Sequence, residues 1–339
     1  MMEFDYNLQP LTTFNVPAPV AAFSRFQSVE GLLEILHEAK PLPLYNNLLL
    51  LGGGSNMLFT KKFEGLVLKN ECKGIELVQE DENYFYVKVG GGENWHQLVM
   101  HCVQQQWAGI ENLALIPGCV GAAPIQNIGA YGVELKDVFH SLEALHLYDH
   151  STITFDHAAC TFGYRDSVFK HAYKNQLAIL SVTLKLAKTP RLRTSYGAIE
   201  QELQKMGSLQ PGIAEVSQAV INIRRSKLPD PAVVGNAGSF FKNPVIAAAH
   251  YQELKRSFPT IPGFAVANEQ VKVPAAWLIE QCGWKGYREG DAGVNALQPL
   301  VLVNFGKATG SQVFELSGRI IESVAARFAI QFEREVNIF

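Results

Sequence analysis

The amino-acid sequence predicts an α+β protein built from more than one domain. Helical and strand patterns follow one another without the regular strand–helix–strand rhythm of a parallel α/β sheet. The chain has 339 residues, which is more than one ordinary domain usually holds. Hydrophobic residues make up 47% and charged residues 18%, a composition typical of a folded globular protein and not of a disordered one.

The first elements follow from local patterns. Residues 28–40 carry apolar side chains at helical spacing and stop at Pro41, which predicts a short helix. Residues 48–51 form an apolar strand that leads directly into a glycine-rich loop. Strand patterns at 74–79 and 84–89 flank a short acidic segment, so a hairpin is predicted there.

The middle of the chain gives two helices and one long strand. A helix is predicted at 94–105, after a run of three glycines. Residues 178–186 alternate between apolar and mostly polar side chains, as in a half-buried strand. Residues 213–227 have an apolar helical face, and Pro229 prevents the helix from continuing.

Sequence patterns near the C-terminus predict a third domain. Thr309 and Gln312 have the spacing of a capping box and begin a long helix through residue 328. Residues 332–338 are predicted to form a closing strand. The motif Pro229-Asp230-Pro231 stiffens and exposes the chain, so we place the main domain boundary there. The predicted parts are residues 1–70, 71–229 and 230–339.

Charge and cysteine usage exclude several classes of protein. The net charge of -3 gives no general attraction to nucleic acid or to an anionic membrane. The five cysteines show no C-x-x-C spacing and the nine histidines no metal-ligand spacing, so we predict reduced thiols and no metal site. The N-terminus lacks the basic and apolar regions of a signal peptide, and no apolar run approaches the ~18–20 residues of a membrane span. We therefore expect a cytoplasmic protein.

Two glycine-rich loops lie in the first half of the chain. One is Gly52-Gly53-Gly54-Ser55-Asn56, and the other begins at Pro117 and continues to Gly132. Glycines let backbone N–H groups surround an anion such as a pyrophosphate, although each loop alone is equally explained as a tight turn. Two such loops favour a dinucleotide without saying which one. The usual signatures of Rossmann folds, P-loops, zinc proteases and α/β-hydrolases are absent.

Three polar residues in separate motifs suggest proton donation to a substrate held beside a cofactor. Ser239 lies in a loop between glycines and an aromatic pair, Arg165 follows Gly163-Tyr164, and Glu335 lies close to the C-terminus. Each has a simpler explanation. Ser239 suits a turn, Arg165 is next to Asp166 and suits an ion pair, and a carboxylate near a strand end is by default solvated.

A basic helix end and a tyrosine loop give further candidates. Arg224 and Lys227 lie three residues apart and share a helix face, which suits a phosphate or a carboxylate. The alternative is a pair of cations that complements the helix dipole. Tyr196, in Ser195-Tyr196-Gly197, is either a core residue or one that covers a ligand.

Taken together and in order, these motifs resemble the UDP-N-acetylenolpyruvoylglucosamine reductase family. The resemblance covers nearly the whole chain, and Ser195-Tyr196-Gly197 is similar to the subgroup with a tyrosine loop over the substrate. Several long motifs in the right order are far more specific than one loop. The strongest are residues 51–58, 116–132, 162–167, 227–231 and 235–244.

The resemblance implies a fold and a reaction. The fold is the FAD-binding fold of the vanillyl-alcohol-oxidase type, with residues 1–70 and 71–229 as two α+β lobes around non-covalent FAD and 230–339 as a substrate domain. NADPH reduces FAD, and hydride then passes from flavin N5 to UDP-N-acetylglucosamine enolpyruvate, giving UDP-N-acetylmuramate for peptidoglycan. The preference for NADPH over NADH rests on the resemblance alone. We expect a monomer whose partners are these two small molecules.

The resemblance also assigns roles to residues. Ser239 matches the proton donor, while Arg165 and Glu335 would stabilise the enolate-like charge. The matching substrate contacts are Tyr196, Lys227, Asn243, Arg224 and Tyr131. The matching cofactor contacts are Gly52, Gly53, Gly54, Ser55, Asn56, Gly118, Cys119, Val120, Gly121, Ala122, Ala123, Asn127 and Gly129.

Two other functions stay open at this point. Another FAD-linked oxidase of the same fold would explain the glycine loops, but not Ser239 together with Arg165 and Glu335. A catalytically silent protein that binds flavin or a UDP-sugar would not need that set either. The sequence also departs from the family at Ala122-Ala123, where close relatives often carry hydroxyl groups.

Overall fold

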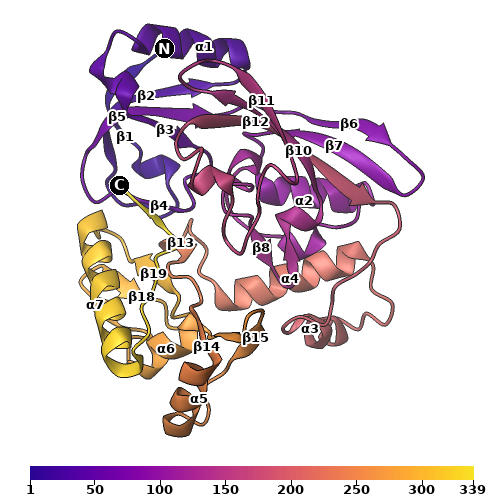
Figure 1. Cartoon of the computed structure of the whole chain (residues 1–339), viewed down its shortest axis with the longest axis vertical. Helices are drawn as coiled ribbons and strands as arrows, with labels where there is room; N and C mark the ends of the chain where they lie inside the picture. Colours follow the sequence, from indigo (N-terminus) through magenta and orange to yellow (C-terminus); the bar gives the residue numbers. More distant parts are fainter. The chain divides into compact units, whose positions relative to one another are not determined.

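The computed structural model describes all residues, 1–339, and the chain forms two compact units (Figure 1). Unit 1 contains residues 1–6, 20–54 and 64–226, and unit 2 contains residues 7–19, 55–63 and 227–339. Both units mix helices with mostly antiparallel strands, which confirms the predicted α+β class. None of the helices combines the length and hydrophobicity that crossing a membrane requires.

The first sheet of unit 1 has four strands and one covering helix, α1 (Val29–Ala39). Ser28 caps this predicted helix by accepting the Gly31 N–H at 3.1 Å. Leu32 and Leu36 of α1 pack with Leu48 and Leu66 of the sheet in one hydrophobic cluster. In spatial order the strands are β1 (Glu3–Asn7), β2 (Pro19–Phe26), β5 (Phe63–Asn70) and β3 (Leu48–Leu51).

The second sheet of unit 1 is antiparallel and contains the predicted hairpin. The hairpin residues pair from Ile75 with Val89 to Glu80 with Phe85. In spatial order the strands are β11 (Thr152–Asp156), β10 (Phe139–His146), β12 (Leu177–Ala187), β7 (Tyr84–Gly90) and β6 (Ile75–Glu80).

The prediction that the strand at 178–186 is half-buried was wrong for its first half. Leu180 belongs to the same hydrophobic cluster as α1, whereas Ile179 belongs to the larger cluster of unit 1. The two faces of β12 therefore meet different clusters, and Ser181 on the second face is also buried.

Three helices complete unit 1: α2 (Trp95–Gln104), α3 (Ile199–Lys205) and α4 (Ile213–Lys227). Asn94 caps α2 by accepting the Gln97 N–H at 3.0 Å. The apolar face predicted for α4 is buried, and α4 has the predicted bounds. The basic residues Arg224, Arg225 and Lys227 lie at the end of α4, so the packing of its apolar face determines their positions.

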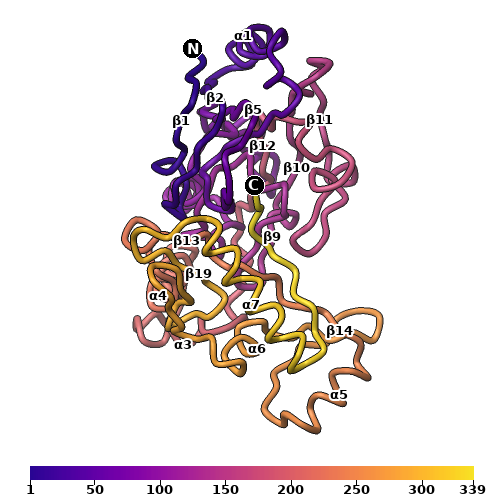
Figure 2. Tube along the Cα trace, turned by 90° about the vertical axis from the view of Figure 1, so that its left-hand side faces the viewer, coloured from indigo at the N-terminus to yellow at the C-terminus, as the bar shows by residue number.

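Unit 2 is built on a four-stranded sheet covered by helix α7 (Gly310–Phe328), which also packs on α6 (Ala275–Gln281) (Figure 2). Thr309 and Gln312 form the predicted capping box. In spatial order the strands are β13 (Gly235–Ser239), β19 (Val301–Asn304), β18 (Ala292–Val294) and β17 (Arg288–Glu289). A smaller sheet, β14 (Val245–Ala247), β16 (Gln270–Lys272) and β15 (Phe264–Val266), packs with α5 (Ala248–Ser257).

The C-terminal strand is shorter than predicted. Only β20 (Asn337–Ile338) is a strand, and it pairs in parallel with β4 (Met57–Leu58). The residues before it make single bonds to another segment: Lys242 N–H donates to Glu333 O at 2.9 Å, and Glu335 N–H donates to Phe240 O at 2.8 Å. The buried hydrophobic residues form three clusters, one of which joins residues 22–72 with residues 145–180, and segments 7–19 and 55–63 belong to unit 2.

Candidate active site

The first glycine loop begins where β3 ends, and close packing requires a glycine at position 53. A Cβ on Gly53 would lie 2.6 Å from the Cα of Gly118 in the second loop. Gly54 has a φ of +61°, the left-handed conformation in which successive N–H groups can converge on an anion. Lys69 Nζ donates to Gly52 O at 3.1 Å and adds positive charge beside the loop. These features fit the diphosphate of a dinucleotide.

The second glycine loop uses most of its N–H groups inside the protein. The N–H groups of Val120 and Gly121 donate to Glu93 O and Gly91 O at 2.9 and 2.8 Å. Ala122 and Ala123 donate within the loop, at 3.0 and 3.1 Å. The N–H groups of Ala122 and Ala123 therefore already have acceptors within the protein. A cofactor would meet this loop chiefly at Gly118 and Cys119.

A cavity of about 580 Å³ opens in unit 1 beside these loops. Lys69 and Lys73 line it together with Gly92, Asn94 and Cys119. Its volume lies in the range of small-molecule pockets, roughly 300–1,000 Å³. The cavity and the glycine loops together can accommodate a ligand that carries phosphate.

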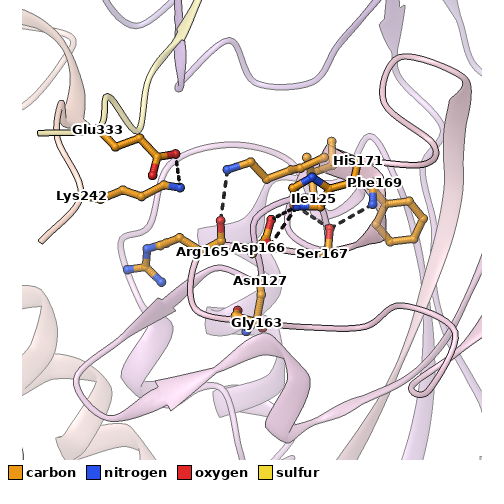
Figure 3. Close-up of polar contacts among 11 residues, drawn as sticks. Ile125, Asn127, Gly163, Arg165, Asp166, Ser167, Phe169, His171, Lys242 and Glu333 are labelled. Carbon is orange, nitrogen blue, oxygen red and sulfur yellow. Dashed lines mark hydrogen bonds and ion pairs between the residues drawn. The ribbon is translucent and has the colours of Figure 1, made fainter. Parts of the chain in front are cut away.

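Arg165 lies in a tight turn whose geometry fixes its direction (Figure 3). Gly163 N–H donates to Asp166 O at 3.0 Å across the turn, and Arg165 has a φ of +53°, which is unfavourable for a residue with a side chain. Arg165 Nη2 donates to Gly129 O at 2.6 Å. The carboxylate of the neighbouring Asp166 engages His171 Nε2 at 2.8 Å.

Two polar side chains attach this turn to the second glycine loop (Figure 3). Asn127 is fully buried, and its Nδ2 donates to Gly163 O at 2.9 Å and to Glu134 at 3.0 Å. Its Oδ1 accepts the Lys136 N–H at 3.0 Å. Ser167 Oγ donates to Ile125 O at 2.6 Å. Asn127 therefore holds the turn with both of its amide hydrogens and with its Oδ1.

Arg224 is a half-buried cation near Arg165 and Tyr131. Its Nε is enclosed and has no hydrogen-bond partner in the protein. Burial lowers the pKa of Arg224, the charge of Arg165 lowers it further, and Tyr131 opposes the shift. Burial likewise raises the pKa of the Tyr131 hydroxyl. Two guanidinium groups and a tyrosine thus form an electropositive cluster suited to an anion.

Tyr196 is held against the tip of the β8–β9 hairpin, formed by β8 (Gly129–Ala130) and β9 (Val133–Glu134). Gly132 at the tip has a φ of +80°, and a Cβ there would lie 3.3 Å from the Cβ of Tyr196. Arg193 Nη1 donates to Gly132 O at 3.3 Å. The Tyr196 side chain is 55% exposed, so the loop presents it on the surface beside Tyr131 and does not bury it in the core.

In unit 2, the backbone brings Ser239 and Glu335 together. Ser239 is the last residue of β13 and is exposed. The next residue, Phe240, accepts the Glu335 N–H through its carbonyl at 2.8 Å. Asn56 Nδ2 donates to Glu335 O at 3.1 Å, which ties the end of the first glycine loop to the same segment. Lys242 pairs with Glu333 (Figure 3).

The other predicted substrate contacts, Asn243 and Lys227, differ in which of their polar groups can still bind a ligand. Asn243 Oδ1 accepts the Ala275 N–H at 2.9 Å at the start of α6, so its Nδ2 remains the group that can donate to a ligand. Lys227 is exposed at the end of α4.

Two polar residues that support this site carry no recognisable sequence motif. Asn112 is fully buried, and its Nδ2 donates to Tyr131 O at 3.0 Å and to Arg193 O at 2.8 Å. It therefore joins the β8–β9 hairpin to the tyrosine loop. His96 accepts a backbone N–H through its ring. Neither forms a metal-type or catalytic motif, and only the fold reveals their partners.

Comparison with known proteins gives two family matches and close relatives. Residues 230–339 match the C-terminal domain of UDP-N-acetylenolpyruvoylglucosamine reductase, and residues 20–153 match an FAD binding domain. A reductase of that name from Amoebophilus asiaticus is 50% identical over 98% of this chain and 97% of its own length. The one from Pseudomonas syringae pv. syringae is 48% identical over 98% of this chain and 97% of its own length.

A solved structure shows the same fold. The crystal structure of UDP-N-acetylenolpyruvylglucosamine reductase from Thermus caldophilus superposes with a TM-score of 0.65 at 23% identity. The match covers 100% of this chain and 98% of that chain.

Proposed function

The chain belongs to the UDP-N-acetylenolpyruvoylglucosamine reductase family, and from this premise we propose that it reduces UDP-N-acetylglucosamine enolpyruvate to UDP-N-acetylmuramate. The product is a precursor of peptidoglycan. The observation that supports the proposal most strongly is the pairing, within unit 1, of a glycine-built diphosphate site with the cationic cluster of Arg165 and Arg224. The substrate carries both a diphosphate and a carboxylate. We further propose a cytoplasmic monomer.

FAD, when bound and reduced by NADPH, supplies the hydride to the enol ether of the substrate. Gly52, Gly53 and Gly54 would hold its diphosphate, together with Gly118 and Cys119 of the second loop. Lys69 adds charge beside them. The neighbouring cavity offers space for the rest of the nucleotide.

The proposed reaction needs charge stabilisation at the substrate carboxylate. Adding hydride to the conjugated double bond makes an enolate-like dianion, which preorganised donors must stabilise. Arg165 is preorganised by its turn and by Gly129 O, and Arg224 is preorganised by burial. Glu335, as a protonated carboxyl, would donate one further hydrogen bond.

The proposed proton donor is Ser239. Its exposed position at the end of β13 leaves the hydroxyl accessible to a ligand. Lys242 lies three residues further on, but Glu333 neutralises much of its charge. Lys242 is therefore a weaker candidate for lowering the cost of the serine alkoxide than its position in the sequence suggests.

The remaining contacts are proposed to bind the sugar nucleotide. Lys227 would contact the diphosphate as an exposed cation, and Asn243 would donate from Nδ2. Tyr196 would cover the ligand from its loop beside Tyr131.

Product analysis tests this function. The purified protein with FAD is incubated with NADPH and UDP-N-acetylglucosamine enolpyruvate, and the sugar nucleotides are separated and identified by mass spectrometry. We expect stoichiometric conversion to the lactyl ether. Oxidation of NADPH without that product would favour another FAD-linked oxidase, and a flavin-bound protein without turnover would favour a silent binding protein.

A further inference from the structure

The backbone at the start of α2 is hydrogen-bonded to the second glycine loop. Trp95 N–H donates to Gly118 O at 3.0 Å, and Val120 N–H donates back to Glu93 O at 2.9 Å. Asn94 and Cys119 form a β-bridge between these bonds. The segment that would meet a cofactor diphosphate therefore takes its backbone shape from residues 91–96.

The side chain of His96, at the start of α2, also makes a hydrogen bond to the segment that leads into the second glycine loop. His96 Nδ1 accepts the Leu115 N–H at 3.0 Å. Leu115 has a φ of +59°, a left-handed conformation that is unfavourable for a residue with a branched side chain. Leu115 lies three residues before Gly118, so the conformation of Leu115 sets the direction in which the loop leaves the protein core. The hydrogen bond that the Leu115 N–H donates to His96 compensates for the strain at this point.

The hydrogen bond requires a particular state of the imidazole. Because Nδ1 accepts a hydrogen bond, it carries no proton, and the neutral ring holds its hydrogen on Nε2. Burial lowers the pKa of His96, and the charges of Arg225 and Arg224 on α4 lower it further. The cationic end of α4 thus keeps the ring in the form that can accept the Leu115 N–H.

We propose that His96 is a positioning residue for the cofactor, holding Leu115 so that Gly118 and Cys119 face the FAD diphosphate. The proposal rests on FAD binding as described under the proposed function. His96 acts through the loop and has no direct part in the reaction. In its protonated form Nδ1 becomes a donor and repels the Leu115 N–H, so the loop loses this contact.

Affinity for FAD tests the proposal with three variants. His96→Leu keeps the approximate volume and removes the acceptor, whereas His96→Asn places Oδ1 near the position of Nδ1. His37→Leu changes an exposed histidine on α1 and serves as the control. The dissociation constant is measured by the change in flavin fluorescence when FAD is added to each apoprotein. Urea unfolding of the apoproteins identifies variants that fail to fold.

We expect His96→Leu to weaken FAD binding by about tenfold or more, the effect of losing a buried hydrogen bond. His96→Asn and His37→Leu should stay within a few-fold of the wild type. Because the pKa of His96 lies below the ordinary histidine value of about 6.5, the wild type should keep its affinity at pH 6.5 and lose it only as the pH falls through that lowered pKa and the imidazole protonates. His96→Asn should lose less affinity over the same pH range.

Unchanged affinity in a folded His96→Leu, or equal losses in His96→Leu and His96→Asn, would overturn the role of His96. Identical pH profiles for the wild type and His96→Asn would do the same. A wild type that binds FAD but does not use UDP-N-acetylglucosamine enolpyruvate would overturn the proposed function alone, because the FAD comparison does not involve that substrate.

Discussion

Arg224 shows how one residue can carry a cost that a ligand can offset. Its Nε is enclosed without a partner, and an unsatisfied buried donor costs about 1–3 kcal/mol. Arg165 nearby adds repulsion of like charge. A bound carboxylate or phosphate would satisfy the donor and cancel the repulsion, which is why we place Arg224 in the substrate site.

Arg224→Met should therefore stabilise the apoprotein while weakening the enzyme. Removing a half-buried cation whose Nε has no partner in the protein should raise the free energy of unfolding by ~1 kcal/mol, and the KM for the UDP-sugar should rise. Urea unfolding and steady-state kinetics measure the two effects. Arg25→Met, which breaks a surface ion pair with Glu71, is the control and should change neither by much. A destabilised Arg224→Met with an unchanged KM would contradict the assignment.

Ser239→Ala should separate the two halves of the proposed reaction. Flavin reduction by NADPH needs no proton from Ser239, so its rate should stay near that of the wild type. Reoxidation by the UDP-sugar should slow by ~10² or more, as for other general-acid steps. Anaerobic stopped-flow absorbance follows both steps, with Ser257→Ala as an exposed-serine control. Equal slowing of both steps would remove Ser239 from its role.

At the scale of elements, the contact between the two glycine loops depends on close packing at Gly53. The Gly53 Cβ position lies 2.6 Å from Gly118 Cα, which is backbone and cannot move aside as a flexible side chain can. Gly31 in α1 is a useful contrast, because a Cβ there would meet only Ser28 Oγ at 3.6 Å. Replacing glycine by alanine should therefore disturb the structure at position 53 and be tolerated at position 31.

Gly53→Ala should weaken FAD binding by at least tenfold because the two loops would be forced apart. Gly31→Ala should leave FAD binding unchanged and raise stability by roughly 0.5–1 kcal/mol, the gain from replacing glycine inside a helix. Fluorescence titration with FAD and thermal unfolding measure these effects. Tight FAD binding by Gly53→Ala would show that the loops do not form the cofactor site as proposed.

Elements with local signals could be predicted well from the sequence. Ser28, Asn94 and Thr309 each cap the helix that follows them, and the apolar face of α4 is continuous. Elements that depend on distant partners could not be predicted. The final strand is only two residues long because its partner is β4, nearly three hundred residues earlier, and it is not an adjacent hairpin strand.

In the candidate site, too, residues in local motifs could be predicted and residues that depend on distant partners could not. Motif residues such as Arg165, Ser239 and Glu335 were visible in the sequence, and the roles we propose for them rest on family resemblance. Residues that act by holding others were not visible. Asn112 and His96 each bond to backbone groups that are 19 to 81 residues away, and no spacing rule indicates such partners.

At the scale of the whole molecule, charge and thiols agree with an enzyme that acts on small molecules. The net charge is -3, and α4 ends with the cations Arg224, Arg225 and Lys227. Burial raises the pKa of Cys102 and of Cys160 to about 12, so both thiols stay protonated at neutral pH. These cysteines pack in the hydrophobic core and have no place in the proposed chemistry.

The central claim is that one flavin in this chain passes hydride from NADPH to the UDP-linked enol ether. The measurement that tests it most directly is the visible flavin spectrum of the purified protein without oxygen, recorded after NADPH and again after UDP-N-acetylglucosamine enolpyruvate. We predict that the flavin band bleaches with the first addition and recovers rapidly with the second. Bleaching without recovery, or no flavin band even after FAD is added, would contradict the account.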